Sequence, residues 1–254
     1  MSIAFFDIDG TLAIGRDIPA SAEQALAQMR ANGHLVFICT GRPRAYAEKN
    51  FGQYADGFVC NNGRLAFMGE RTLHDRALTT EEVEGFIKTL DSVGSGYAFL
   101  EEWHAWYGGD PAYEHIAAGV WEPSMFSVGV DPTSIHAFNF DIYFADAAHR
   151  QRIADALGDA CLVNPHGPHP SADVTVLGCD KGDAIESVAQ VLGVSLADVY
   201  AFGDGVNDQP MLRAAGHGVA MGNAVDELKA IAEYVTTDID KDGIKNALEH
   251  YGLI

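Results

Sequence analysis

The sequence predicts an α/β fold, with a doubly wound parallel sheet and a second, inserted α+β domain. Short apolar runs alternate with amphipathic stretches at both ends of the chain, as in parallel sheets whose strands are joined by crossover helices. Between residues 79 and 178 the pattern changes to strands with polar alternation and turns that contain Gly and Pro. A chain of 254 residues can form two compact units. We therefore expect a core formed by residues 1–78 and 179–254, with residues 79–178 as the inserted domain.

The first segment of the core contains three apolar runs that we expect to be strands, at residues 3–8, 34–40 and 57–60. Ser21 to Gln24 has the spacing of a capping box, and apolar residues continue at helical spacing until Asn32-Gly33. A second helical stretch begins near Arg42. This alternation of strands and helices favours a parallel sheet.

The inserted domain opens with Thr79-Thr-Glu-Glu82, a second capping box, which predicts a helix. Its strands are expected at residues 97–100 and 138–144, in a sheet with one solvent-facing side. After residue 178 the core pattern resumes, with a helix from about Lys181 and strands at 199–202 and 218–221.

The chain is strongly acidic, with a formal net charge of −20 at pH 7. This charge would repel nucleic acid and anionic membranes, and no run of Lys or Arg forms a basic patch. No apolar stretch approaches the length of a membrane span, and no signal segment precedes the first strand. The four cysteines share no metal-ligand spacing: Cys39, Cys60, Cys161 and Cys179. We therefore expect reduced thiols and a cytoplasmic protein.

Two acidic motifs follow predicted strands. Asp7-Ile8-Asp9-Gly10-Thr11-Leu12 stands at the end of the first strand, and Gly203-Asp204-Gly205-Val206-Asn207-Asp208 follows the strand at 199–202. Ligands gather at the carboxyl ends of the strands in open parallel sheets, so these carboxylates are candidate oxygen ligands for Mg²⁺. The alternatives are a simple chain reversal at Asp9-Gly10 and a calcium loop in the second motif. The second motif lacks the spaced acids and the terminal Glu of an EF-hand.

Two further motifs are candidates for phosphate binding. Thr40-Gly41-Arg42 stands where a strand leads into a helix, so the Thr hydroxyl and the following N–H groups could hold a phosphate oxygen. Lys181-Gly182 opens a helix, and its ammonium could neutralise a phosphate or a nucleophilic carboxylate. The alternatives are an N-cap with an exposed Arg, and an ordinary surface lysine.

Together, the four motifs resemble those of the haloacid dehalogenase superfamily, in the same order and in the same strand-end contexts. The insertion between the second and third motifs is similar to that of Cof-type phosphatases, as is Asn61-Asn62-Gly63 just before it. The resemblance extends over essentially the whole chain. It implies a Rossmann-like core and a cap domain that selects the substrate.

The resemblance also implies chemical roles. Asp7 would attack phosphorus and form an aspartyl-phosphate, and Asp9 would protonate the leaving alcohol and then activate water. Thr40 and Lys181 would hold the transferring phosphoryl group. The implied substrate-binding residues are Thr40, Gly41, Arg42, Lys181 and Asn207.

A Mg²⁺ ion is the cofactor that the resemblance implies. Its expected ligands are Asp7, the backbone carbonyl of Asp9, and Asp204, with Asp208 close by or acting through water. The metal would let the anionic nucleophile and the anionic phosphate approach each other.

The inserted domain carries few basic residues: only Lys88, Arg150 and Arg152 lie between residues 79 and 177. A second phosphate on the substrate would need such groups. We therefore expect a small phosphate monoester with a neutral or cationic remainder, such as a sugar phosphate or pyridoxal phosphate. Trp103 and Trp106 could stack on its ring, with core packing as the alternative reading. His166 and His169 could reach the site, or be ordinary exposed loop histidines.

Two rival functions use the same motifs. A phosphosugar mutase would return the phosphate to another hydroxyl, but such an enzyme normally needs a basic cap. A non-catalytic phosphate-binding protein would not need both Asp7 and Asp9. We expect a monomer or a weak homodimer.

Overall fold

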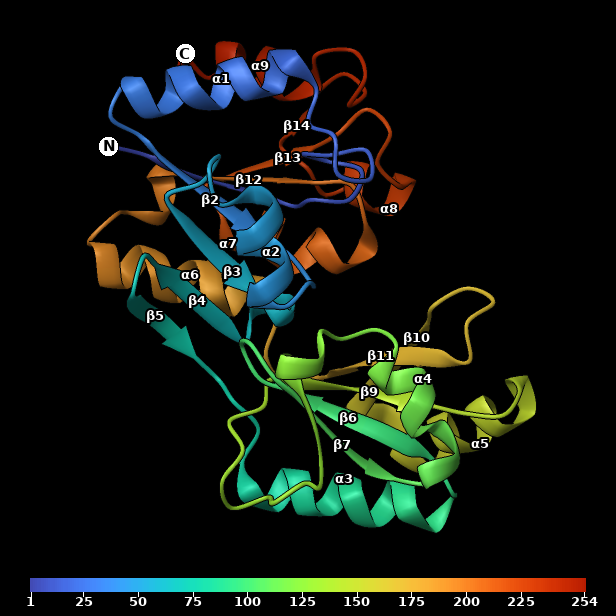
Figure 1. Cartoon of the computed structure of the whole chain (residues 1–254). Helices are drawn as coiled ribbons and strands as arrows, with labels where there is room; N and C mark the ends of the chain where they lie inside the picture. Colours follow the sequence, from blue (N-terminus) through green and yellow to red (C-terminus); the bar gives the residue numbers. More distant parts are fainter. The chain divides into compact units, whose positions relative to one another are not determined.

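The chain folds into two compact units. The computed structural model describes residues 1–254, and it divides them into Met1–Asp75 with Cys179–Ile254 as unit 1, and Arg76–Gly178 as unit 2 (Figure 1). Unit 1 is therefore built from both ends of the chain, as in an insertion. That unit 1 is catalytic and unit 2 selects the substrate stays a prediction.

Unit 1 contains an eight-stranded sheet in the order β14-β13-β12-β1-β2-β3-β4-β5. The strands from β14 to β3 pair in parallel, whereas β4 and β5 form an antiparallel hairpin at one edge that the sequence pattern did not reveal. The sheet is therefore mixed, with the expected doubly wound arrangement at its centre. The strands are β1 (Ile3–Phe6), β2 (Leu35–Cys39), β3 (Gly57–Cys60), β4 (Leu65–Met68), β5 (Arg71–Asp75), β12 (Val199–Gly203), β13 (His217–Ala220) and β14 (Tyr234–Val235).

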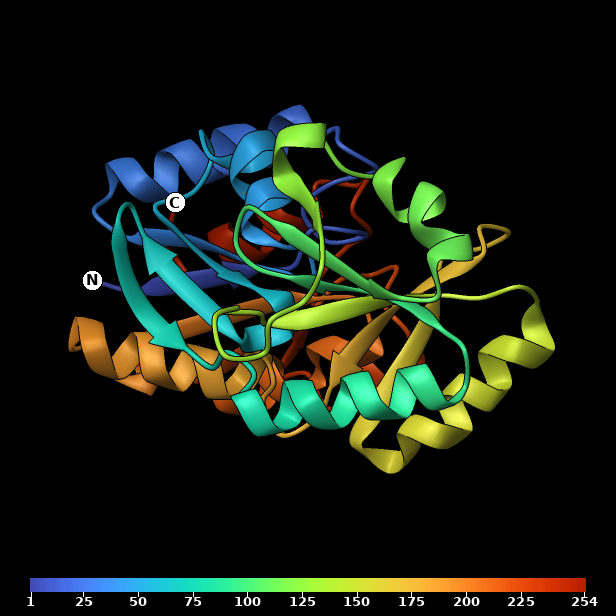
Figure 2. The ribbon, with the colours of Figure 1, turned by 60° about the horizontal axis from the view of Figure 1, so that its bottom comes forward.

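Helices cover both faces of this sheet: in Figure 2, α1 and α2 lie on one side and α6 on the other. The helices of unit 1 are α1 (Ala20–Ala31), α2 (Arg44–Phe51), α6 (Lys181–Leu192), α7 (Gln209–Ala214), α8 (Asp226–Lys229) and α9 (Gly243–His250). Short 3₁₀ turns are η1 (Asn61–Gly63), η5 (Leu196–Asp198) and η6 (Val206–Asp208).

The first helix starts two residues earlier than a cap at Ser21 would place it, at Ala20 instead of Ala22. Pro19 is the N-cap of α1 and makes no side-chain capping bond, so the capping box expected at Ser21 to Gln24 is wrong. The backbone N–H groups of Ala22 and Glu23 instead donate to the Pro19 carbonyl. A proline is well suited to this position because it fixes its own φ before the helix.

Unit 2 contains a six-stranded sheet in the order β10-β11-β9-β6-β7-β8, antiparallel except for the β7–β8 pair. Its strands are β6 (Gly96–Leu100), β7 (Ala105–Gly109), β8 (Phe126–Val128), β9 (Asn139–Tyr143), β10 (Cys161–Pro165) and β11 (Ser171–Val176). Its helices are α3 (Thr80–Ser92), α4 (Glu114–Ala118) and α5 (Ala147–Leu157), with 3₁₀ turns η2 (Pro111–Tyr113), η3 (Pro123–Met125) and η4 (Gly158–Ala160). The predicted capping box of α3 is confirmed, because Thr79 and Glu82 bond each other's backbone N–H groups.

The two faces of the unit 2 sheet differ. Helices α3 and α5 pack on one face through a core that includes Val83, Phe99, Phe140 and Ile153. Helix α4 covers part of the other face, where Ala117 packs near Tyr143. Figures 1 and 2 both show α3 along one side of the sheet and α4 on the opposite side. The face under α4 also carries polar side chains.

No helix is long and apolar enough to cross a membrane. All four cysteine side chains are buried, as expected for Cys39 and Cys60 in their apolar strands.

Candidate active site

Asp7 stands at the centre of the unit 1 sheet. It directly follows β1, which lies between β12 and β2, and its backbone N–H continues the ladder by donating to the Phe202 carbonyl at 3.0 Å. Only 8% of Asp7 is exposed. The sequence Ile3–Phe6 is wholly buried because it forms a central strand with both faces covered, so Asp7 is the first polar group at its carboxyl end.

The neighbouring strand β12 supplies the two other acids. Asp204 follows Gly203 directly, and Asp208 lies one 3₁₀ turn later, where its Oδ2 accepts from the backbone N–H groups of Asp204 (3.0 Å) and Gly205 (2.9 Å). A Cβ on Gly203 would lie 2.5 Å from that of Asp208, so only glycine allows this close turn. These bonds hold the fully buried Asp208 carboxylate against the start of its own loop.

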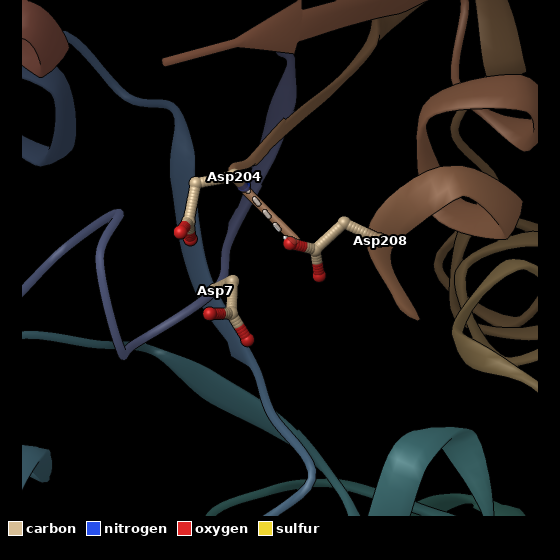
Figure 3. Close-up of side chains that lie close together, drawn as sticks. All are labelled: Asp7, Asp204 and Asp208. Atoms are coloured by element: carbon tan, nitrogen blue, oxygen red, sulfur yellow. Dashed lines mark hydrogen bonds between the residues drawn. The ribbon is translucent and has the colours of Figure 1, made fainter. Parts of the chain in front are cut away.

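The three carboxylates form one cluster. Asp7, Asp204 and Asp208 each offer an oxygen within 4.8 Å of the other two (Figure 3). Carboxylate oxygens are the donors that Mg²⁺ prefers. The donor set therefore fits a divalent cation of this kind, and the residues come from segments about 200 positions apart in sequence.

Lys181 is buried between two of these acids. Its Nζ donates to Asp7 Oδ1 at 2.6 Å and to Asp208 Oδ1 at 2.7 Å, and its side chain is 1% exposed. Asp180 fixes the start of α6 by accepting from the N–H groups of Gly182 and Asp183. This N-cap therefore sets where α6 begins, and with it the position of Lys181.

The charged groups of the cluster shift one another's pKa values. Burial lowers the pKa of Lys181, but the carboxylates of Asp7 and Asp208 outweigh it, so the net pKa lies above its ordinary value and the ammonium stays charged. Burial raises the pKa of Asp7 to about 7, against the attraction of Lys181. Burial also raises the pKa of Asp204. Three carboxylates against one ammonium leave a formal charge of −2, which one divalent cation would neutralise.

Two residues of the first motif support Asp204, and the sequence reading gave them no role. The hydroxyl of Thr11, itself fully buried, donates to Asp204 Oδ1 at 2.9 Å. Gly10 has φ +90°, and a Cβ there would lie 2.3 Å from Asp204 Oδ2. The Asp-Gly pair at residues 9–10 was the signal for such a turn. Asn223, also not foreseen, donates to the Gly10 carbonyl at 2.8 Å.

The expected phosphate-binding motif lies at the end of β2. Thr40 is 2% exposed, and its Oγ1 accepts from the backbone N–H of Arg42 at 3.1 Å, which closes a tight turn. The loop Asn61–Gly63 supports this turn, because the N–H of Asn62 donates to the Thr40 carbonyl. Thr40, Gly41 and Arg42 are thus held by one side-chain bond and by backbone bonds, at the same edge of the sheet as Asp7.

Asp9 and Asn207 lie outside the buried cluster. The Asp9 carboxylate is about half exposed and pairs with the guanidinium of Arg42 at 3.2 Å. Its side chain therefore does not join the three carboxylates. That the backbone carbonyl of Asp9 binds the metal stays a prediction. Asn207 is exposed and makes no hydrogen bond to Lys181.

The candidate residues of unit 2 are two tryptophans and two histidines, and the two histidines share one partner. Trp103 is 46% exposed, whereas the indole N–H of Trp106 is buried without a hydrogen-bond partner. Nδ1 of His166 and of His169 both lie within hydrogen-bonding distance of Ser171 Oγ, at 2.9 and 2.8 Å. Trp106 lies on the α3 side of the sheet, since it pairs with Phe99.

Comparison with known families agrees with the motifs. The sequence profile of the haloacid dehalogenase-like hydrolases matches residues 4–248. The chain belongs to this family. The hydrolase is 30% identical over 255 residues to YkrA of Bacillus subtilis (strain 168), with 99% of this chain and 98% of YkrA covered. It is also 28% identical over 262 residues to the HMP-PP phosphatase of Klebsiella pneumoniae (strain 342), covering 98% and 95% of the two chains.

A solved structure shares the whole fold with this hydrolase. The subclass IIB sugar phosphatase BT4131 superposes with a TM-score of 0.76 at 30% identity, and each chain is covered completely. The resemblance to Cof-type members of the superfamily is thereby confirmed, and the hydrolase is a phosphatase of this superfamily.

Proposed function

We propose that this hydrolase is a Mg²⁺-dependent phosphatase that acts on small phosphate monoesters through an aspartyl-phosphate at Asp7. The observation that carries the proposal is the convergence of Asp7, Asp204 and Asp208 around one position beside Lys181. The relatives named as phosphatases for HMP-PP and for sugar phosphates make a small phosphorylated metabolite the natural substrate class.

Asp7, Asp204 and Asp208 are the side chains that would hold the Mg²⁺ ion, together with the backbone carbonyl of Asp9. A bound divalent cation would supply positive charge that lets a phosphate dianion approach the nucleophilic carboxylate. Thr11 supports this site by fixing one oxygen of Asp204, so that less reorganisation is needed when the ion binds.

Asp7 is suited to be the nucleophile because one of its oxygens is already fixed. Lys181 holds Oδ1, so Oδ2 is the atom that would form the new bond to phosphorus while the bond to the leaving oxygen breaks. Asp9, half exposed and paired with Arg42, would give its proton to the leaving alcohol. It would then take a proton from the water that releases phosphate from Asp7.

Thr40, Gly41, Arg42 and Lys181 would bind the phosphoryl oxygens, with Asn207 at the edge of the site. The turn after β2 is already closed by the hydrogen bond from the Arg42 N–H to Thr40 Oγ1 and by backbone bonds to the Asn61–Gly63 loop. Electrostatic stabilisation of a phosphoryl group requires such preorganisation. Unit 2 would act as the substrate-specificity domain.

The experiment is hydrolysis of p-nitrophenyl phosphate by the purified protein, with Mg²⁺ and with EDTA. We expect activity only with the metal, and none in Asp7→Asn. Asp198→Asn changes an exposed aspartate of unit 1; it is the matched control and should retain full activity. Borohydride reduction during turnover should convert Asp7 to homoserine, which mass spectrometry would detect. Activity of Asp7→Asn near the wild-type rate would refute the proposed nucleophile.

A further inference from the structure

The loop that follows β13, residues 221–225, binds both acidic motifs of unit 1. The backbone N–H of Val225 donates to the Asp204 carbonyl at 2.9 Å. The side chain of Asn223 reaches the first motif, where its Nδ2 donates to the Gly10 carbonyl at 2.8 Å. One loop therefore holds both of the segments that carry the clustered carboxylates, although it supplies no carboxylate to the cluster.

Both ends of the Asn223 amide group are used. Its Oδ1 accepts from the backbone N–H of Ile239 at 2.9 Å, while its Nδ2 is bonded to Gly10. Ile239 belongs to the segment between β14 and α9, and the N–H of Gly222 donates to the Thr237 carbonyl of the same segment at 3.1 Å. A primary amide that accepts at one end and donates at the other has one orientation. Asn223 is therefore a fixed bridge from this segment to the Gly10 turn.

The Gly10 carbonyl is a sensitive point of the first motif. It belongs to the peptide group that joins Gly10 to Thr11, whose hydroxyl donates to Asp204 Oδ1 at 2.9 Å. Gly10 has φ +90°, and glycine has more backbone freedom than any other residue. A rotation of this peptide group would move the Thr11 hydroxyl relative to Asp204. The hydrogen bond from Asn223 opposes that rotation.

The exposure of Asn223 separates this role from a contribution to stability. The side chain lies at the surface, so water can replace either of its hydrogen bonds at a small cost in the free energy of unfolding. Water does not fix the orientation of the Gly10 peptide group, however. Removal of the Asn223 amide should therefore leave the fold intact and loosen the Gly10 turn.

We propose that Asn223 is a positioning residue of the active site, which acts through Gly10 and Thr11 to hold the Asp204 carboxylate in place for Mg²⁺. Residues behind metal ligands orient those ligands and tune the metal affinity. Asn223 is two steps behind the carboxylate, because Thr11 contacts Asp204 and Asn223 contacts the peptide group before Thr11. The inference rests on the proposed function, in which Asp204 binds the metal.

The test is binding of Mg²⁺ alone to the purified protein, measured by isothermal titration calorimetry without substrate. Asn223→Ala should raise the Kd at least about threefold, less than the 10- to 100-fold typical of a residue that contacts the metal ligand itself. In hydrolysis of p-nitrophenyl phosphate, the Mg²⁺ concentration for half-maximal activity should rise by the same factor. The kcat at saturating Mg²⁺ should stay near the wild-type value, because the nucleophile is untouched.

Asn32→Ala is the matched control. Asn32 is also exposed and uses both ends of its amide: Nδ2 donates to the Leu253 carbonyl at 3.0 Å, and Oδ1 accepts from Gln28 Nε2 at 2.9 Å. It precedes β2, at the amino ends of the parallel strands, whereas the acids follow the carboxyl ends. The two variants should lose similar stability in thermal melting, but only Asn223→Ala should bind Mg²⁺ more weakly.

A double-mutant cycle with Thr11→Val tests the route from Asn223 to the metal site. Residues that act through one another are not additive. Once the Thr11 hydroxyl is gone, the orientation of the peptide group before it matters less. Adding Asn223→Ala to Thr11→Val should therefore raise the Kd by a smaller factor than it does in the wild type.

Three results would overturn the inference: an unchanged Kd in Asn223→Ala, an equal rise in Asn32→Ala, or the same factor in the Thr11→Val background. Failure of the proposed function looks different, since the wild type itself would then show no Mg²⁺-dependent hydrolysis of p-nitrophenyl phosphate. The calorimetric comparison does not depend on turnover, so the two failures are distinguishable.

Discussion

Lys181 and Asp208 form a buried ion pair, with 2.7 Å between Nζ and Oδ1 and 1% exposure of both side chains. The same ammonium also holds Asp7, so one lysine neutralises part of the charge of two acids from different strands. Buried pairs of this kind add little net stability when intact, but removing one partner leaves an unpaired charge in the interior.

Lys181→Met should therefore destabilise the fold and abolish activity. The uncompensated carboxylates of Asp7 and Asp208 should cost about 3–5 kcal/mol in the free energy of unfolding, measured by urea denaturation. Lys245→Met, which removes an exposed lysine paired with Glu249 at 3.7 Å, should cost less than about 1 kcal/mol. Equal effects of the two substitutions would show that the Lys181 charge is not needed to balance the buried acids.

Gly10→Ala should disturb the metal site, because its Cβ would collide with Asp204. Gly15→Ala is the matched control: its φ of +69° carries a similar backbone penalty, but no atom lies within 4 Å of its Cβ. Both variants should lose about 1 kcal/mol of stability. Only Gly10→Ala should also require more Mg²⁺ for half-maximal activity. The same Mg²⁺ requirement in the two variants would contradict the clash as the cause.

Thr11→Val should weaken Mg²⁺ binding while leaving the nucleophile intact. It replaces the hydroxyl that fixes Asp204 Oδ1 with a methyl group of similar size, and loss of such a supporting bond typically costs 10- to 100-fold in metal affinity. A Mg²⁺ titration of activity should show a raised half-saturation point and a kcat that recovers at high Mg²⁺. Loss of kcat that excess metal does not restore would point to a role of Thr11 beyond support of the metal.

Asp141→Asn should change how the stability of the ligand-free protein depends on pH. Burial raises the pKa of Asp141, a residue of β9, from 3.8 to about 7, so between these pH values the folded state keeps a proton that the unfolded state has lost. Wild-type stability should therefore fall across this window as pH rises, by at most about 4 kcal/mol from this residue.

The measurement is the difference in melting temperature between variant and wild type, from about pH 4 to pH 8. It should grow in favour of Asp141→Asn as pH rises, whereas the difference for Asp159→Asn, which changes an exposed aspartate of unit 2, should stay flat. A flat difference for Asp141→Asn would mean that the carboxylate ionises as easily in the folded state as in the unfolded state.

Local sequence signals predicted most of the elements near the site. The runs before Asp7 and Asp204 are apolar because their strands are buried on both faces, and a continuous apolar run is visible without any tertiary information. The capping box at Thr79 and the start of α6 at Lys181 are local as well. The box expected at Ser21 was wrong, since Pro19 starts α1 with no side-chain cap.

The sequence by itself determined which residue types stand at the ends of the strands, and those types were sufficient to identify a haloacid dehalogenase-like hydrolase. Only the tertiary structure decided that Lys181 lies between Asp7 and Asp208, that Thr11 supports Asp204, and that Asp9 pairs with Arg42 instead of joining the cluster. The same holds for Asp141 and Asp173, which become neighbours only through strand pairing. The physical reason is range: strand and cap patterns reflect interactions within a few residues, whereas charge balance and hydrogen-bond pairing depend on which distant segments the sheet brings together.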